Sequence, residues 1–159
     1  IRVNVHVGAA VTDQGLLQGR AAETLRERHR LGCAQVGILA DLRVKHAHPL
    51  AERPLEDEVR DLRLRGLADA VIVSGAATGS GADPQQLRRV REVLPDCPLL
   101  VGSGMTEDNL SEFLPWADGW IVGTSLQVPG TGSGEKRISS ARARSFLERL
   151  AAHPSGGGS

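Results

Sequence analysis

The sequence predicts an α/β fold with a parallel sheet, of the type found in (β/α)8 barrels. Segments with the apolar pattern of strands alternate five times with segments that carry helix patterns and helix caps. Two consecutive glycine turns, VGSGMT and IVGTSL, each follow an apolar run, as in the phosphate site after the seventh and eighth strands of many barrels. Along the first two strands polar and apolar side chains alternate, which leaves one apolar face to pack on helices.

Each expected strand is a short apolar run bounded by turn or loop residues. Parallel strands need crossover connections, so we expect a helix between each strand and the next. In chain order the expected strands are Ile1–Val7, Val36–Val44, Asp69–Ser74, Leu99–Val101 and Gly119–Val122.

The expected helices carry recognisable start signals. The run LEDEVRDLRLRG has acids in its first turn, and Asp83 is a good N-cap in front of Pro84 at the first helical position. The sequence TEDN supplies a cap and early acids to a helix that begins at Thr106. The glycine-rich segment VPGTGSGEKRISS is expected to be mobile. Besides the helix at Thr106, the predicted helices cover Leu17–Leu31, Leu55–Gly66, Pro84–Leu94 and Ser140–Ala152.

Composition argues against several classes of function. The formal net charge is zero and aromatic residues make up 3% of the 159 residues, so the chain lacks the charge and the stacking surface of a nucleic-acid-binding protein. No apolar run approaches the roughly 20 residues that span a bilayer. Cys33 and Cys97 lack metal-like spacing and are expected as small buried thiols in a reducing compartment. We expect a soluble intracellular protein of the cytoplasm or an organellar matrix.

The two ends of the chain differ in character. It opens inside an expected strand, without an initiator methionine or a signal peptide, and closes on HPSGGGS. We expect that residues precede Ile1 in the natural protein, so that any targeting segment lies outside this sequence. The expected domain is residues 1–152, followed by a flexible tail over residues 153–159.

The two glycine turns predict a site for an anion, most simply a phosphate. Glycine lets the main chain approach a ligand closely, and a helix N-terminus after each turn adds positive charge. The alternative is a pair of ordinary strand-to-helix turns. The candidate ligand-binding residues are Gly102, Ser103, Gly104, Thr106, Gly123, Thr124 and Ser125.

Polar side chains on the first two strands are expected to point into the barrel, towards its mouth: Asn4, His6, Asp41, Arg43 and Lys45. Charge is expensive there unless it is paired or used. The residues therefore form either a ligand-facing cluster or an interior ion pair of Asp41 with Arg43 or Lys45. Asp41, Lys45 and Asn4 are the candidate catalytic residues. Lys45 is a Schiff-base amine, a phosphate partner or an ion-pair partner, while Asn4 and His6 bind hydroxyls or are satisfied interior groups.

Two further groups of residues have both a functional and a purely structural interpretation. Ser74-Gly75 and Thr78-Gly79 form a third turn suited to an anion, or a tight loop of small residues. His46 and His48 lie near Asp41, but two histidines in a loop before a proline are more typical of a surface than of a metal site. We expect no metal and no cofactor.

Five segments resemble the BtpA/SgcQ family: IRVNVHVGAAVTDQG, LADLRVKHAHPL, RPLEDEVRD, LADAVIVSGAATG and LLVGSGMTEDNLSEFLPWADGWIVGTSL. The resemblance runs from Ile1 to Leu150, and its strings VKHA and VSGAATG are specific. Members of the family are longer (β/α)8 barrels, so the resemblance implies that these are the last five of eight units, an incomplete barrel. It also marks as site residues, besides the two glycine turns, Asn4, Asp41, Lys45, His46, Ser74, Gly75 and Thr78.

Two functions from different classes remain. In the first, the complete barrel is an enzyme acting on a small phosphorylated sugar or nucleoside. In the second, suggested by a family branch named for a role in stabilising photosystem I, it is a non-catalytic assembly factor. Five strands cannot close an eight-stranded barrel, so we expect open outer strands and either a homo-oligomer or a separate N-terminal half as partner.

Overall fold

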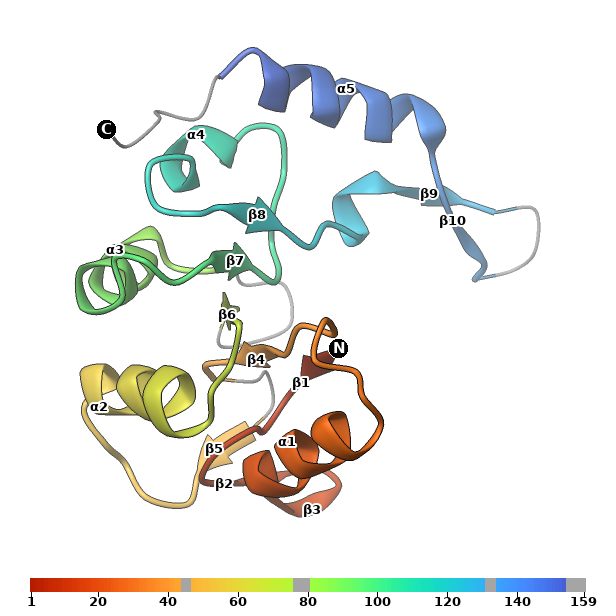
Figure 1. Ribbon diagram of the computed structural model, residues 1–159. Coiled ribbons are helices and arrows are strands. Elements are labelled where there is room, and N and C mark those ends of the chain that lie inside the picture. Colours follow the sequence, from red (N-terminus) through yellow and green to blue (C-terminus); the bar gives the residue numbers. More distant parts are fainter. Residues whose placement is uncertain (44–46, 76–80, 131–133, 154–159) are drawn as a thin grey trace.

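The computed structural model describes residues 1–43, 47–75, 81–130 and 134–153. Its centre is a parallel sheet that confirms the predicted α/β class (Figure 1). Arg2 lies opposite Leu39 at one side of the sheet, and Val101 lies opposite Trp120 at the other. The five strands are, in spatial order, β1 (Arg2–Val3), β4 (Leu39–Asp41), β6 (Ala70–Val73), β7 (Leu99–Val101) and β8 (Gly119–Trp120).

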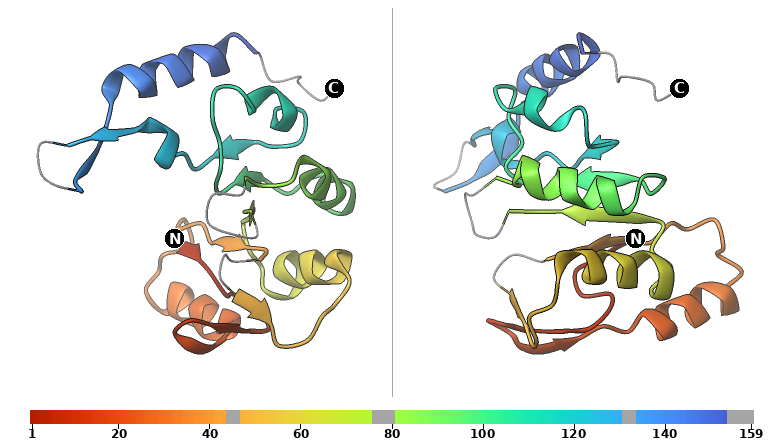
Figure 2. Two further views of the ribbon diagram at one scale, coloured as in Figure 1. Left: turned by 180° about the vertical axis from the view of Figure 1, so that it is seen from behind. Right: turned by 90° about the vertical axis from the view of Figure 1, so that its left-hand side faces the viewer.

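The helices α2 (Leu55–Arg60) and α3 (Pro84–Val93) lie side by side on the same face of the sheet (Figures 1 and 2). A turn of π-helix, η1 (Asp61–Arg65), extends α2. Alternate strand residues face these helices, and the buried core includes Val71 and Val73 of β6. Burying one such side chain fully contributes about 1.5–3 kcal/mol, so this interface stabilises the fold.

Local signals fix two of the helix starts. Asp83 Oδ1 accepts the N–H of Gln85 at 2.9 Å, and Pro84 occupies the first helical position of α3. The helix α5 (Ser140–Ala151) begins after Ser139, whose Oγ accepts the N–H of Arg142 at 3.3 Å. Each cap contributes about 1 kcal/mol. Both starts agree with the sequence prediction.

The first unit differs from its prediction. The strand expected over Ile1–Val7 is only Arg2–Val3, because the main chain beyond it bonds elsewhere: His6 O accepts the N–H of Ala21 at 3.1 Å. The expected turn GAAVTDQG instead contributes to the hairpin of β2 (Ala9–Thr12) and β3 (Gly15–Gln18), so α1 covers Ala21–Arg30 rather than starting at Leu17.

A third strand, β5 (Ala47–Pro49), joins this hairpin through antiparallel pairing of Thr12 with Ala47. Gly15 adopts a φ of +99°, and Thr12 Oγ1 donates to the carbonyl of Gly15 at 3.0 Å. Together they close a tight connection that the loop composition alone did not distinguish from an open turn.

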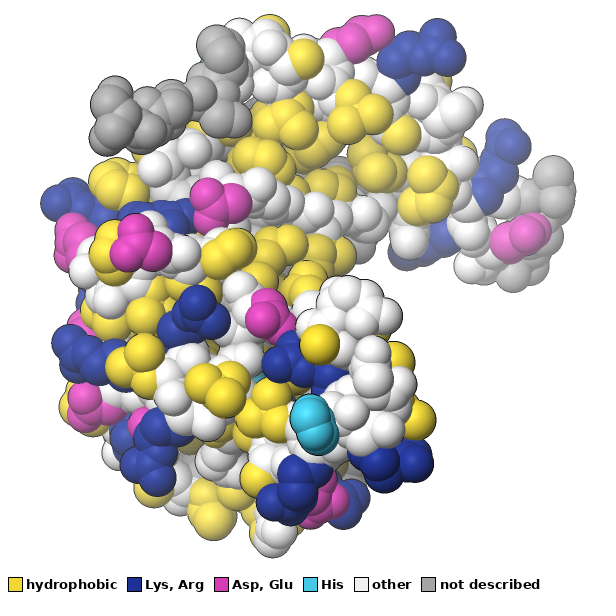
Figure 3. Space-filling view, in the orientation of Figure 1, with side chains coloured by type: hydrophobic (Ala, Val, Ile, Leu, Met, Phe, Trp, Pro, Cys, Tyr) yellow, Lys and Arg dark blue, Asp and Glu magenta, His cyan; other side chains and the backbone are white. Residues whose placement is uncertain are grey.

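The segment expected to be mobile also contains regular structure. After the short 3-10 helix η2 (Thr124–Leu126), β9 (Gln127–Pro129) pairs antiparallel with β10 (Lys136–Ile138). Residues 131–133 of this segment lie outside the described residues. The hairpin leads into α5, whose Phe146 is buried. Hydrophobic side chains gather beneath that helix (Figure 3).

Among the described strands, β1 and β8 each pair with a single neighbour in the sheet and so form its two outer edges. The face seen in Figure 3 is hollowed between the β9–β10 hairpin and the part of the molecule that carries α1. No helix in the described ranges combines the length and the apolar content required to cross a membrane.

Candidate functional site

A charged cluster joins the start of β1 to the last residue of β4 and to the residue after β6. The guanidinium of Arg2 grips Asp41 through two hydrogen bonds, Nε to Oδ2 at 2.9 Å and Nη2 to Oδ1 at 2.8 Å. Ser74 Oγ donates to Asp41 Oδ1 at 3.4 Å. Asp41 is only 4% exposed, so this buried carboxylate receives three donors from two neighbouring strands. Arg2, Asp41 and Ser74 are called the Arg2 cluster below.

Arg2 is the member of this cluster that sequence reasoning missed. Its hydrogen bonds with Asp41 hold the pKa of the guanidinium above its ordinary value, although burial acts in the opposite direction. About 40% of its side chain remains exposed, so the fixed cation keeps a face towards solvent. The available signal was its place on the polar face of the first strand, next to the strand that carries Asp41.

Arg43, one of the two partners expected for Asp41, pairs with another carboxylate instead. Arg43 Nε donates to Glu58 Oε2 at 2.8 Å and Nη2 donates to Oε1 at 3.0 Å, which ties the arginine to α2. Since β4 ends at Asp41, the side-chain alternation that would place Arg43 beside it stops. The other expected partner, Lys45, lies outside the described residues, as do His46, Thr78 and Gly79.

Asn4 and Asp41 meet at one cavity of about 410 Å³, named here the Asn4 cavity. Its wall comes from the chain after β1, the end of β4, the residues around β5 and one face of α2. Apolar side chains such as Val5 and Leu62 share the lining with polar ones. The polar and charged members are Asn4, His6, Asp41, Arg43, Arg53 and Glu58. Asn4 and Asp41 are the two candidate catalytic residues within the described ranges, and both line this cavity.

The first glycine turn, Gly102–Thr106, packs directly on the Arg2 cluster. A Cβ on Gly102 would lie 2.4 Å from Ser74 Oγ and 3.5 Å from Arg2 Nη2, so only glycine fits there. Ser103 Oγ accepts the N–H of Gly75 at 3.1 Å and so links this turn to the one after β6. Ser74, Gly75, Gly102 and Ser103, which the sequence predicts as ligand-binding residues, are thus brought together.

The expected helix start at Thr106 is wrong by four residues. Thr106 N–H donates to Asn109 Oδ1 at 2.9 Å, Asn109 N–H donates to Thr106 Oγ1 at 3.3 Å, and α4 covers only Leu110–Phe113. The side chains that cap a helix here hold a turn in front of it instead. A helix dipole consequently adds little to the first glycine turn. Gly104, with a φ of +73°, packs so closely on Gly81 that a Cβ would lie 2.2 Å from its Cα.

The second glycine turn, Gly123–Ser125, follows β8 and is more open. A Cβ on Gly123 would meet nothing within 4 Å. The hydroxyl of Ser125 and the indole Nε1 of Trp120 are buried without a hydrogen-bond partner in the described part of the chain. Buried donors in folded proteins are nearly always satisfied, so these two call for an explanation.

In both glycine turns some main-chain N–H groups have no acceptor within the described residues. The N–H of Gly102 donates to Val73 O at 2.8 Å, and the N–H of Thr106 donates to Asn109 Oδ1. No acceptor among residues 1–43, 47–75, 81–130 and 134–153 is seen for the N–H groups of Ser103, Gly104, Gly123, Thr124 and Ser125. Both turns follow the carboxyl ends of β7 and β8, which are neighbouring, paired strands of the sheet.

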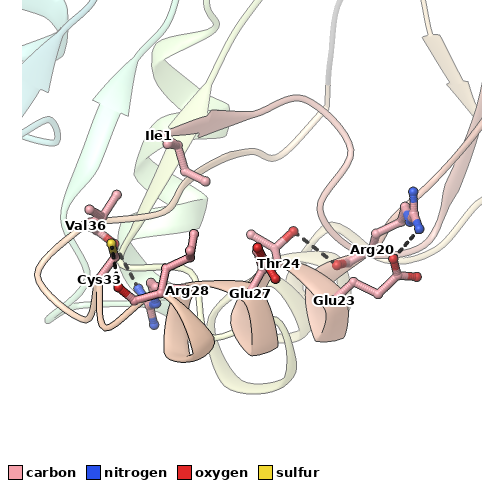
Figure 4. Close-up of a pocket in the computed structure, with 9 residues that line it drawn as sticks. Ile1, Arg20, Glu23, Thr24, Glu27, Arg28, Cys33 and Val36 are labelled. Carbon is pink, nitrogen blue, oxygen red and sulfur yellow. Dashed lines mark hydrogen bonds and ion pairs between the residues drawn. The ribbon is translucent and has the colours of Figure 1, made fainter.

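A second cavity, of about 630 Å³, lies between Ile1 and α1 (Figure 4). Its charged side chains are already paired: Arg20 with Glu23, and Arg28 with Asp69 at 2.8 Å. Cys33 lies at its wall and is a free thiol, only partly buried. Burial raises the pKa of the other cysteine, Cys97, which disfavours its reactive thiolate. None of the candidate site residues predicted from the sequence lines this cavity.

Metal ligation has no support in the described residues. His48 is exposed on β5, and no group of three or more His, Cys, Asp or Glu side chains within the described ranges is placed to hold an ion.

Comparison with known proteins places this geometry in context. The model of the BtpA family matches residues 1–152. The photosystem I biogenesis protein BtpA of Synechocystis sp. is 42% identical over 151 residues, which cover 95% of this chain and 52% of that protein. An uncharacterised protein of Thermococcus kodakarensis is 45% identical over 148 residues, covering 93% and 54%. The chain thus spans about half the length of these curated relatives.

One solved structure, described as "Native KDPGal structure", resembles the fold with a TM-score of 0.53. The match covers 79% of this chain and 52% of the other, at 19% sequence identity. At that identity the likeness shows the fold alone, and it agrees with the barrel type predicted from the alternation of strands and helices.

Proposed function

We propose that this chain, which belongs to the BtpA family, forms the phosphate-binding part of a barrel enzyme that acts on a small phosphorylated sugar or nucleoside. The proposal concerns the complete protein, since the chain spans about half the length of its curated relatives. In that protein the outer strands β1 and β8 pair with further strands, from the same polypeptide or from a second copy.

One observation carries the proposal: within the described residues, main-chain N–H groups of two turns that follow neighbouring parallel strands have no hydrogen-bond acceptor. Ser103 and Gly104 contribute from the first turn, and Gly123, Thr124 and Ser125 from the second. A phosphate has enough acceptor oxygens to satisfy such a set, and an anion gains from oriented N–H dipoles. The orphan hydroxyl of Ser125 fits the same ligand.

The Arg2 cluster places a guanidinium beside the first turn. Both oxygens of Asp41 already accept from Arg2, so the main work of Asp41 in this proposal is to hold the guanidinium next to Gly102. Asn4 orients a substrate hydroxyl in the adjoining cavity. A proton is moved by Lys45, which follows Asp41 in the sequence.

The second candidate function is that of a non-catalytic assembly factor. The observation in its favour is the 42% identity to a relative named as a photosystem I biogenesis protein. Under this alternative the Arg2 cluster and the tight glycine turns serve only to hold the fold. A scaffold then gains stability from salt in general rather than from phosphate in particular.

Thermal unfolding with and without ligands separates these functions. We expect inorganic phosphate, ribose 5-phosphate or a nucleoside monophosphate to raise the unfolding temperature by a few degrees, beyond sodium chloride at equal ionic strength. A ligand at about ten times its Kd adds about 1.4 kcal/mol to the free energy of unfolding.

The variant Ser125→Ala makes the test specific. It removes a buried hydroxyl that has no partner, so the free energy of unfolding without ligand is expected to stay the same or rise slightly. The phosphate-dependent rise in unfolding temperature is expected to shrink. Ser111→Ala, at an exposed position of α4, is the matched control and keeps the full response. Equal responses to phosphate and chloride in the unmodified chain contradict the proposal and favour the assembly factor.

A further inference from the structure

The start of α5 binds the 3-10 helix η2, which contains part of the second glycine turn. Ser139 N–H donates to Leu126 O at 2.9 Å. Arg142 Nη1 donates to Gln127 O at 2.6 Å and to Ser125 O at 3.3 Å. Three consecutive carbonyls at the C-terminal end of η2 are therefore satisfied by α5 and by the residue that caps it.

The other end of the same turn has free donors. Leu126 N–H donates to Gly123 O at 3.0 Å and closes the turn. The N–H groups of Gly123, Thr124 and Ser125 have no acceptor within the described residues. N–H and C=O groups of a helical turn point in opposite directions along its axis, so the bonds from α5 leave these N–H groups free. The turn is thus held from its carbonyl side.

The same helix also contacts the residue that follows the first glycine turn. Ser145 Oγ donates to Glu107 Oε2 at 3.1 Å, and Glu107 comes directly after Thr106, the last residue of that turn. Ser145 lies three positions after Arg142, so both side chains are on one face of α5. Phe146 beside them is buried and anchors the helix. The helix runs from the β9–β10 hairpin towards α4 and joins the two turns (Figure 1).

We propose that α5 holds the two glycine turns at the spacing that one phosphate requires, and that Arg142 is the positioning residue through which it fixes the second turn. This inference rests on the proposed function and adds to it what keeps the site in shape. Arg142 acts through the carbonyl oxygens of the turn and not through contact with the ligand. N–H groups stabilise an anion best when their positions are fixed before it binds, so a loosened turn loses affinity.

An amide NMR titration of the full chain with inorganic phosphate at constant ionic strength tests the role of Arg142. The Kd is measured at Ser103 and Gly104 in the first turn, whereas the hydrogen bonds of Arg142 go to the second. In Arg142→Met this Kd is expected to rise about three- to tenfold, because the second turn is no longer fixed. The urea midpoint of unfolding is expected to stay the same, since the lost hydrogen bonds lie at an exposed place.

Two further variants separate positioning from charge. A single nitrogen of Arg142 makes both hydrogen bonds, so the ammonium of Arg142→Lys can replace it. This variant is expected to keep the Kd within about twofold of the unmodified chain. Arg144→Met removes the same charge from an exposed position of α5 and is the matched control, which leaves the Kd unchanged.

The outcomes distinguish this inference from the function on which it rests. An equal rise of the Kd in Arg142→Met and Arg144→Met shows an effect of charge alone and overturns the positioning role. An unchanged Kd in Arg142→Met, or an Arg142→Lys variant that binds as weakly as Arg142→Met, overturns it as well. In each of these cases the unmodified chain still binds phosphate and the site stands. Amide resonances of both turns that do not respond to phosphate in the unmodified chain overturn both proposals.

Discussion

The two glycine turns are similar in sequence but differ in their surroundings. Both follow a valine, Val101 at the end of β7 and Val122 two residues after β8, and both continue with a hydroxyl residue, as VGS and VGT. Gly102 is enclosed, with Ser74 Oγ and Ile72 Cγ2 within 2.5 Å of where its Cβ would be. Gly123 borders open space. Glycine is thus required by packing in the first turn, whereas in the second it leaves room beside unpaired N–H groups.

This difference bears on how such motifs are interpreted. A glycine that other side chains crowd has a structural explanation, and its presence says little about a ligand. A glycine with space around it needs another reason, and access for a ligand is one. The second turn, with the orphan hydroxyl of Ser125, is therefore the stronger part of the proposed phosphate site.

Breaking the Arg2 cluster is expected to have the largest effect on stability. Arg2→Met leaves the carboxylate of Asp41 buried without its cation, and we expect a loss of about 2–3 kcal/mol in urea unfolding. This is less than the roughly 3–5 kcal/mol of a fully buried pair, because part of the Arg2 side chain is exposed.

The control for this change is Arg43→Met, which removes a similar two-bond contact with Glu58 at a more exposed place. It is expected to cost less than about 1 kcal/mol. Equal losses in the free energy of unfolding for the two variants would show that the burial of Asp41 does not raise the cost of removing its arginine.

A methyl group on the first turn is expected to cost somewhat less. In Gly102→Ala the new Cβ meets Ser74 Oγ and Ile72 Cγ2, and both must move. Overpacking of this kind costs about 1–3 kcal/mol, which chemical denaturation can measure. A neutral outcome would mean that the first turn is as open as the second.

The same methyl group on the second turn is expected to leave stability almost unchanged. Gly123→Ala places the Cβ in open space at a φ of −139°, so the free energy of unfolding should stay within about 0.5 kcal/mol. We expect phosphate to bind more weakly, because the methyl group occupies the approach to the N–H groups. Calorimetric titration with phosphate measures this, and an unchanged affinity would remove the second turn from the site.

The sequence predicted those parts of the fold that depend on local signals. The strand Leu99–Val101 has the predicted bounds, and α3 begins after the predicted cap, because apolar runs and helix caps act over a few residues. The hairpin of β2 and β3 was missed because its residues were interpreted as a turn and the start of a helix. The strand β5 was missed because the pairing of Thr12 with Ala47 joins segments far apart in the chain. The family resemblance is confirmed by the match over residues 1–152.

The candidate site was predicted less completely. Strand periodicity placed Asp41 on the inner face, but it could not identify its partner, because Arg43 lies beyond the end of β4 and Arg2 reaches across from the next strand. His6 is buried and its Nε2 lies 2.8 Å from the carbonyl oxygen of Gly66, a contact that no spacing in the sequence reveals.

The most direct test of the phosphate site is an amide NMR titration of the chain with inorganic phosphate at constant ionic strength. We predict that the amide resonances of Ser103 and Gly104 in the first turn move together with those of Gly123, Thr124 and Ser125 in the second, along binding curves with one common Kd. Resonances that move in only one turn, that follow different Kd values, or that respond equally to chloride would contradict a single phosphate site built from both turns.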